Sequence, residues 1–127
     1  IGDENMIRFL KDGKYSIKME FDLNGAKELL KLFELAYKNL SASVLLDFES
    51  SIEKGKYQKE LYVVKNDLDN RIYRKSTTLI LELDNPSIEY GVHKLSECIN
   101  GEDFYPAEFC EVSFRETNVT IYGFFIK

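Results

Sequence analysis

Few residues of this chain combine the type and spacing that acid–base or nucleophilic chemistry needs. His93 is the only histidine among the 127 residues, so any Ser-His-Asp or Cys-His arrangement must include it. It lies off the apolar stripe of a stretch with helical periodicity, four residues before Glu97. This position favours an exposed histidine that pairs with Glu97, and we expect no catalytic residue.

The cysteines and the acidic residues do not have the spacing of a metal site. Cys98 and Cys110 form no CxxC motif, and each occupies an apolar position where a buried, reduced thiol is expected. The run that begins at Asp67 and Asp69 resembles the start of a calcium loop, but it lacks the required glycine and has Thr78 at its twelfth position. Glycine-rich phosphate-binding motifs are also absent. We therefore expect neither a metal nor a cofactor.

Two further clusters have a functional and a structural interpretation. Glu82 and Asp84 lie two residues apart at a predicted strand end and could form an acid pair, although such pairs are common there. The stretch 54–75 holds seven basic and three acidic residues with interleaved tyrosines, which resembles a single-strand nucleic-acid surface. The net charge of −5 argues against nucleic acid or an anionic membrane as the partner.

The excess negative charge is concentrated in the last third of the chain. Residues 82–127 contain nine acidic and three basic residues, whereas residues 1–81 contain thirteen and fourteen. A field of this sign attracts a basic partner, and an exposed tyrosine can anchor it. The predicted partner-binding residues are Glu97, Glu102, Asp103, Tyr105, Glu108 and Glu111. The alternative is an acidic face that only keeps the protein solvated.

Composition indicates a single globular domain spanning residues 1–127. Hydrophobic residues make up 44% and charged residues 31%, which are ordinary values for a chain that buries its own core. No apolar run approaches the roughly 18 residues of a membrane-spanning helix. We expect a cytoplasmic protein.

Periodicity in the first half predicts a hairpin, a helix and a strand. Asp12-Gly13 separates residues 7–11 from an alternating segment over 15–21, as in a two-residue β-turn. Asp22 or Asn24 can cap a helix whose apolar residues recur at spacings of three and four as far as Leu40. A strand follows over 44–48.

The second half predicts another hairpin, a second helix and two strands. Turn-forming residues at 67–70 separate extended segments over 57–65 and 72–83. Asn85 and the following proline begin a helix over 86–100, and strands over 110–114 and 119–126 end the chain.

These elements predict an α+β domain with the order ββ-α-βββ-α-ββ. Short connections favour a mainly antiparallel sheet, with two amphipathic helices packed on one face. The other sheet face is expected to be open to water or to another molecule. No internal repeat is convincing in the sequence.

In these general terms the chain is similar to small acidic bacterial immunity and inhibitor proteins, a similarity of type that rests on no particular motif. It implies a module that neutralises a basic protein partner, such as a toxin nuclease. One alternative is an enzyme or small-ligand binder with a pocket between sheet and helices. Another is a structural subunit that forms a homodimer through the exposed sheet face or the last strand, 119–126.

Overall fold

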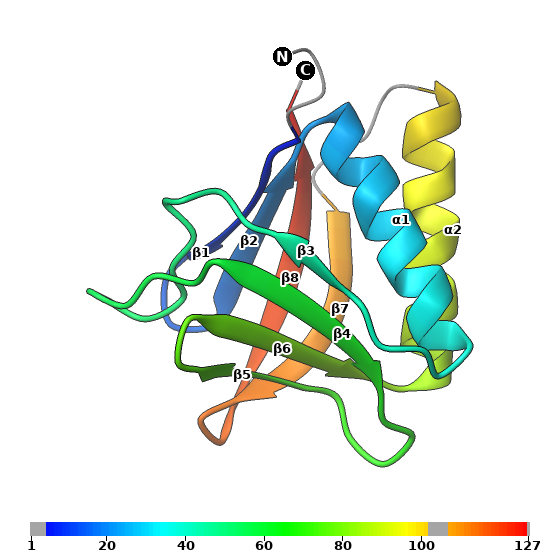
Figure 1. The fold of residues 1–127 in the computed structure, drawn as a ribbon. Helices are drawn as coiled ribbons and strands as arrows, with labels where there is room; N and C mark the ends of the chain where they lie inside the picture. The colour runs from blue at the N-terminus through cyan, green and yellow to red at the C-terminus, as the bar shows by residue number, and fades with distance from the viewer. Residues whose placement is uncertain (1–4, 102–106, 127) are drawn as a thin grey trace.

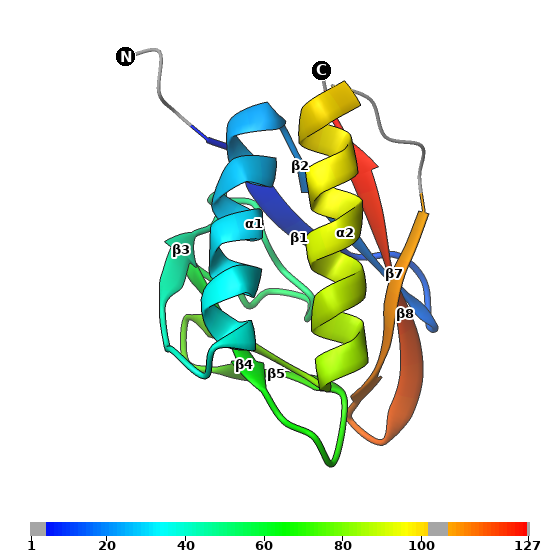
Figure 2. The same ribbon diagram turned by 90° about the vertical axis from the view of Figure 1, so that its right-hand side faces the viewer.

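The computed structural model describes residues 5–101 and 107–126, which form two helices and eight strands. In chain order the elements are β1 (Ile7–Lys11), β2 (Ser16–Phe21), α1 (Leu23–Tyr37), β3 (Ser43–Leu45), β4 (Glu60–Lys65), β5 (Arg71–Lys75), β6 (Thr78–Leu83), α2 (Asn85–Gly101), β7 (Ala107–Phe114) and β8 (Thr117–Phe125). The strands form one sheet (Figure 1), and α1 and α2 lie side by side over one of its faces (Figure 2). The predicted α+β class is confirmed. No helix in these residues is long and apolar enough to cross a membrane.

The sheet is mixed, with the strand order β1-β2-β8-β7-β5-β6-β4-β3. Four pairs of strands that are consecutive in the chain are antiparallel: β1 with β2, β3 with β4, β5 with β6, and β7 with β8. Parallel contacts join these pairs, between β2 and β8, β4 and β6, and β5 and β7. Three of the antiparallel pairs have short connections, as predicted, whereas the fourteen residues 46–59 join the antiparallel strands β3 and β4.

The predicted hairpin across residues 67–70 is wrong. The stretch 72–83 contains two strands, because the chain reverses at Ser76 and Lys75 pairs with Thr78. β4 then pairs with β6, so β4 and β5 are not neighbours. Ser76 takes a positive φ of 58°, a conformation that favours glycine or asparagine, so its residue type gave no turn signal. The order between the helices is consequently ββββ and not βββ.

The structure contains an internal repeat that the sequence did not reveal. β1-β2-α1-β3-β4 and β5-β6-α2-β7-β8 are two ββαββ units with the same order of elements. Arg8 pairs with Glu20 across β1 and β2, and Arg71 pairs with Glu82 across β5 and β6. In each unit an arginine on the first strand is followed, at the end of the second strand, by the sequence Glu-x-Asp, which is residues 20–22 in one unit and 82–84 in the other. This pattern is too short to stand out in the sequence alone.

Equivalent aspartates begin the two helices. Asp22 accepts hydrogen bonds at one carboxylate oxygen from the backbone N–H groups of Gly25 (2.7 Å) and Met6 (3.0 Å), so it caps α1 and ties it to the start of β1. Asp84 accepts a hydrogen bond from the N–H of Ser87 at 2.9 Å. The second cap is thus Asp84 and not the predicted Asn85.

The segment after β3 runs along the outer edge of β1. The N–H of Asp47 donates to the carbonyl of Ile7 and that of Ser51 to the carbonyl of Phe9, both at 2.8 Å. Ser50, which is fully buried, accepts a hydrogen bond from the N–H of Phe9 at its hydroxyl. The edge of β1 is therefore covered. β8 lies inside the sheet between β2 and β7, so the alternative of a homodimer through the edge of the last strand does not hold.

Close contact between the helices and β7 depends on a missing side chain. Phe33 of α1 and Phe109 of β7 pack edge to face, with ring centroids 5.9 Å apart. Gly91 of α2 lies beside this pair, and a Cβ atom there would stand 2.4 Å from the Phe33 ring. The sheet and both helices can approach each other because position 91 has no side chain.

Replacing Gly91 with alanine should destabilise the fold by about 2 kcal/mol, because Phe33 must move in a packed core. The matched control is Gly101→Ala in the last turn of the same helix, where a Cβ meets nothing within 4 Å. Denaturant unfolding of both variants measures the difference. Equal free energies of unfolding would contradict the packing described here.

Candidate functional site

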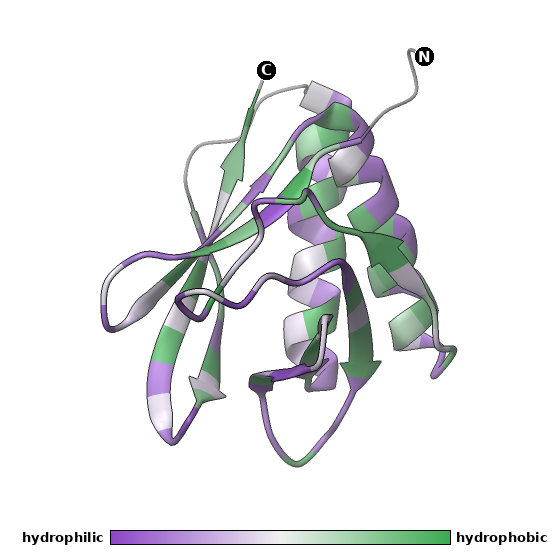
Figure 3. Ribbon diagram, turned by 60° about the vertical axis from the view of Figure 1, so that its left-hand side comes forward, coloured by the Kyte–Doolittle hydropathy of each residue, from purple (hydrophilic) through white to green (hydrophobic). Residues whose placement is uncertain are grey.

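No described segment covers the sheet face that points away from the helices, which we call the uncovered face, and aromatic side chains lie on it. Strand alternation divides the residues, so that Ile121 and Leu61 are buried under the helices while Tyr122 and Tyr62, next to them in the chain, turn to the other face. The alternation of apolar and polar residues along the strands is visible in Figure 3. Four aromatic residues lie partly buried on this uncovered face: Tyr62, Tyr73, Tyr122 and Phe124.

A β-bulge places two of the predicted carboxylates on this face. Glu108 and Glu111 are three residues apart, a spacing that would put them on opposite faces of a regular strand. The register shifts just after Glu108, and the residues between them, 109–110, are both buried. Glu108 pairs with Tyr122 and Glu111 with Thr120, which lie two apart on β8. Both glutamates are therefore exposed on the uncovered face.

A buried glutamate organises the neighbouring part of the same face. Glu82 is 8% exposed and accepts hydrogen bonds from Arg71 Nε at 2.6 Å, Asn66 Nδ2 at 2.8 Å and the Tyr73 hydroxyl at 2.9 Å. Burial alone would raise the pKa of Glu82, but these hydrogen bonds and the arginine charge hold the pKa below the ordinary glutamate value. Burial and the hydrogen bond to Glu82 raise the pKa of Tyr73. Glu82 is therefore a charged anchor for three side chains.

The predicted acid pair of Glu82 and Asp84 is divided between two structural tasks. Glu82 binds Arg71, whereas the carboxylate of Asp84 caps α2 through the N–H of Ser87. Each carboxylate thus has its own partners.

Two adjoining hollows lie where β5 and β7 meet. These strands pair in register only at Arg71 and Ser113, so the sheet is open on either side of that pair. One hollow, of about 440 Å³, is lined by Asp69, Arg71, Ile72, Tyr73, Ser113 and Arg115. The other, of about 240 Å³, is lined by Leu68, Asp69, Asn70, Asp84, Glu111, Val112, Ser113 and Asn118. Polar side chains thus surround shallow space beside Glu111.

The predicted partner-binding residues do not form one cluster. Glu97 lies on α2, in the helical layer, where its carboxylate is 3.4 Å from His93 Nε2 and makes an ion pair with Lys94 (3.7 Å). Glu108 and Glu111 share the opposite, uncovered face of the sheet. The remaining three lie outside the described residues: Glu102, Asp103 and Tyr105. The aromatic residues of the uncovered face were not predicted as a group, because strands far apart in the sequence supply them.

The only histidine is exposed to solvent, whereas both cysteines are buried, so no cysteine–histidine pair is available for nucleophilic chemistry. The side chain of His93 is 66% exposed. Cys98 and Cys110 are buried, and burial raises the pKa of the Cys110 thiol to about 12. Within the part of the chain that the structure describes, no three histidine, cysteine or acidic side chains are grouped so that they could hold a metal ion.

Comparison with known proteins gives no relative: no protein-family model, curated protein or solved structure matches this chain. Its function must be argued from its own residues.

Replacing Glu82 with glutamine should reduce stability by about 2 kcal/mol at pH 7, because Arg71 loses its charged partner. A carboxyl whose pKa is lowered by folding stabilises the protein above its unfolded pKa, near 4.3, and loses this contribution as the pH falls through the folded pKa. The gap between wild type and variant should therefore shrink at about pH 3.

Denaturant unfolding at both pH values measures this effect, and Glu111→Gln is the control because that side chain is exposed. A gap that is the same at both pH values, or equal in the two variants, would contradict the role of Glu82.

Proposed function

We propose that this chain is a protein-binding module whose uncovered sheet face docks onto a basic protein and neutralises it, as an immunity or inhibitor protein does. The observation that supports the proposal is the pairing of Tyr122 with exposed Glu108 on a face that none of residues 5–101 and 107–126 covers. Tyrosine buries a large area at low entropic cost, so a partly exposed tyrosine beside carboxylates suits a partner rich in lysine and arginine.

The balance of charge on the uncovered face supports a basic partner. The cations of this face have carboxylate partners: Arg8 and Lys18 bind Glu20 at 3.1 Å and 3.9 Å, and Arg71 binds Glu82 at 2.6 Å. Among the described residues, Glu108 and Glu111 make no ion pair within 4.0 Å. The charge left to meet a partner on β7 is therefore negative.

A toxin nuclease is a suitable partner class because its active site must be cationic to hold phosphates. Carboxylates such as Glu108 and Glu111 can meet those cations, while Tyr122 and Phe124 supply apolar area around them. The polar hollow beside Glu111 offers room for a long basic side chain. The proposal places the chain in the cytoplasm, where buried thiols remain reduced.

Charge reversal on β7 tests the proposal. Wild-type protein should capture a basic protein from a lysate of the source organism, and Glu108→Lys/Glu111→Lys should weaken its affinity for the purified partner at least roughly 30-fold, mainly through slower association. The control, Glu34→Lys/Glu89→Lys, reverses two exposed glutamates on the helices and should leave affinity unchanged.

Melting temperatures of both double variants must match the wild type for the comparison to count. The proposal is wrong if the captured partner is acidic, or if the β7 and helix variants bind it equally well.

A further inference from the structure

Four segments of the chain meet at one end of the sheet: residues 11–15, 51–59, 74–77 and 114–117. The strand directions bring three of them together. The strands β1 and β2, β5 and β6, and β7 and β8 form antiparallel pairs, while β2 is parallel to β8 and β5 to β7, so the turns of the three pairs lie at the same end. All four segments lie on the left-hand side of Figure 1, and we call this region the basic end.

The loop over residues 51–59 contacts two of these turns through its backbone. The carbonyl of Ser51 accepts a hydrogen bond from the N–H of Lys11 at 3.3 Å, and the N–H of Lys59 donates to the carbonyl of Thr77 at 2.7 Å. The basic end is therefore one surface, built from parts of the chain that are far apart in the sequence.

Positive charge is concentrated at the basic end. Its four segments contain eight basic and three acidic residues, whereas the rest of the chain contains nine basic and nineteen acidic residues. The net charge of −5 thus hides a surface of the opposite sign. Charges separated by more than about 8 Å are largely screened at physiological ionic strength, so an anion bound here meets mainly the local cations. The net charge of the whole chain therefore does not exclude an anionic ligand at this end.

Glu53 holds three of these cations in place. Its carboxylate lies 2.6 Å from Arg115 Nη2 and 3.5 Å from both Lys56 Nζ and Arg74 Nε. Burial acts to raise the pKa of Glu53, but the charges of the three cations hold the pKa below the ordinary glutamate value. One negative charge thus fixes three positive ones, and the cluster keeps an excess of positive charge.

The other five basic side chains of this end are available to an anionic ligand. Among residues 5–101 and 107–126, no carboxylate lies within 4.0 Å of Lys11, Lys14, Lys54, Lys59 or Lys75. The ammonium group of Lys11 instead donates to the backbone carbonyls of Gly13 and Lys14. This surface therefore combines a fixed cluster of cations with lysines that can move toward a ligand.

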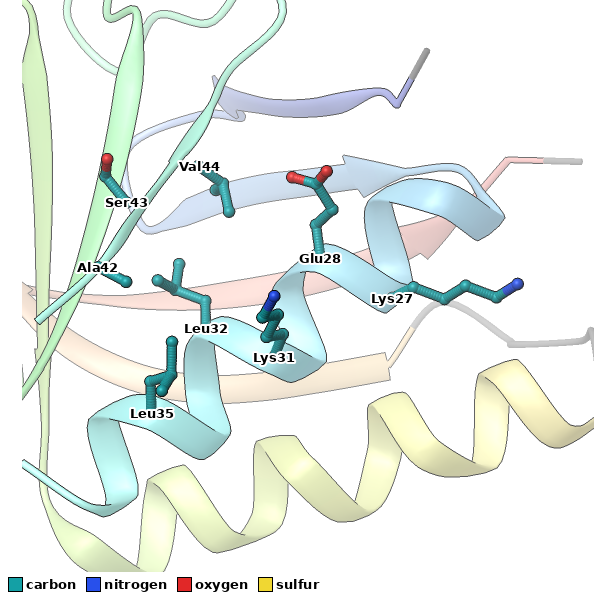
Figure 4. Close-up of a pocket in the computed structure, with 8 residues that line it drawn as sticks. All are labelled: Lys27, Glu28, Lys31, Leu32, Leu35, Ala42, Ser43 and Val44. Atoms are coloured by element: carbon teal, nitrogen blue, oxygen red, sulfur yellow. The ribbon is translucent and has the colours of Figure 1, made fainter. Parts of the chain in front are cut away.

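The excess of one sign is local to this end. The groove between α1 and β3 is lined by Lys27, Glu28 and Lys31 together with apolar side chains (Figure 4). Charges of both signs in that groove select neither an anion nor a cation, whereas the basic end is complementary to an anion.

Two exposed tyrosines accompany the cations. Tyr15 and Tyr57 are each 59% exposed. Lys14 Nζ lies 5.4 Å from the centre of the Tyr15 ring, and Tyr57 follows Lys56 in the chain. Exposed aromatic rings beside lysine and arginine are the groups that bind single strands, because bases stack on the rings while the cations bind the phosphates. A lipid headgroup or an acidic peptide would use the cations and leave the rings without a partner.

We propose that the basic end binds single-stranded nucleic acid, with its lysines and arginines on the phosphates and with bases stacked on Tyr15 and Tyr57. A duplex keeps its bases stacked on each other, so the tyrosines favour a single strand over a double one. This site does not depend on the proposed function, because the carboxylates of that function are Glu108 and Glu111 of β7. Different variants test the two sites.

Fluorescence anisotropy of a labelled oligothymidylate of about 15 nucleotides tests the phosphate contacts. Wild type should bind it at about 50 mM salt, and the affinity should fall steeply as the salt concentration rises. Lys54→Gln/Lys75→Gln should weaken binding at least about tenfold and reduce the slope of log affinity against log salt by roughly 1.4, because two phosphate contacts are lost. The control, Lys27→Gln/Lys31→Gln, removes two exposed lysines of α1 and should change neither quantity.

A second set of variants tests the stacking. Tyr57→Ala should weaken oligothymidylate binding at least about fivefold, because a base loses the ring on which it stacks. The same variant should bind heparin, a polyanion without bases, as tightly as wild type does, and Tyr57→Phe should keep the affinity for the oligonucleotide because the ring remains. Tyr90→Ala is the control, since Tyr90 is an exposed tyrosine of α2.

All the substituted side chains are exposed, so the variants should melt at the temperature of the wild type. Four results would overturn the proposal. These are no binding at about 100 µM protein in about 50 mM salt, equal affinities of the two double-lysine variants, an equal loss for Tyr57→Ala on heparin and on the oligonucleotide, or tighter binding to a duplex or to phosphatidylserine vesicles.

Discussion

Helices α1 and α2 lie over one face of the sheet, and this one-sided burial determines which side chains of every strand enter the core. Because successive residues of a strand point to opposite faces, each strand gives half of its side chains to the core and half to the uncovered face. Ile17, Ile121 and Leu81 are thereby fixed in the core. The residues between them are free to carry charge or aromatic groups, and the proposed binding residues of β7 and β8 are among them.

The two ββαββ units use the same scaffold for different purposes. In the first, Arg8 binds Glu20 and also Asp47 in the segment that covers the β1 edge, so the ion pair helps to close the fold. In the second, Glu82 is more deeply buried and collects hydrogen bonds from Arg71 and from two neighbouring side chains. The corresponding junction, between β5 and β7, is paired in register only at Arg71 and Ser113, and the polar hollows lie beside it. The repeated ββαββ order thus forms the scaffold, and the candidate site lies where the two units differ, between β5 and β7.

Two surfaces of different character result from this arrangement. The uncovered face around Glu108 and Tyr122 combines carboxylates with partly buried aromatic groups, which suits a charged, folded partner. The edge of β3 is uncharged and only three residues long, with Leu45 exposed on it.

Local interactions allowed the sequence to determine the α+β class, the helices and most strands. Helical spacing around Phe33 and Leu95 depends on residues close together in the chain, and periodicity reports it directly. The first hairpin was also predicted, although its connection is residues 12–15 and not the two-residue turn Asp12-Gly13. Tertiary structure decided what requires distant partners: the place of β8 inside the sheet, the bulge that brings Glu108 and Glu111 to one face, and the separation of Glu97 from both. Strand order depends on which buried faces pack together, a property of the whole chain that no short window of sequence contains.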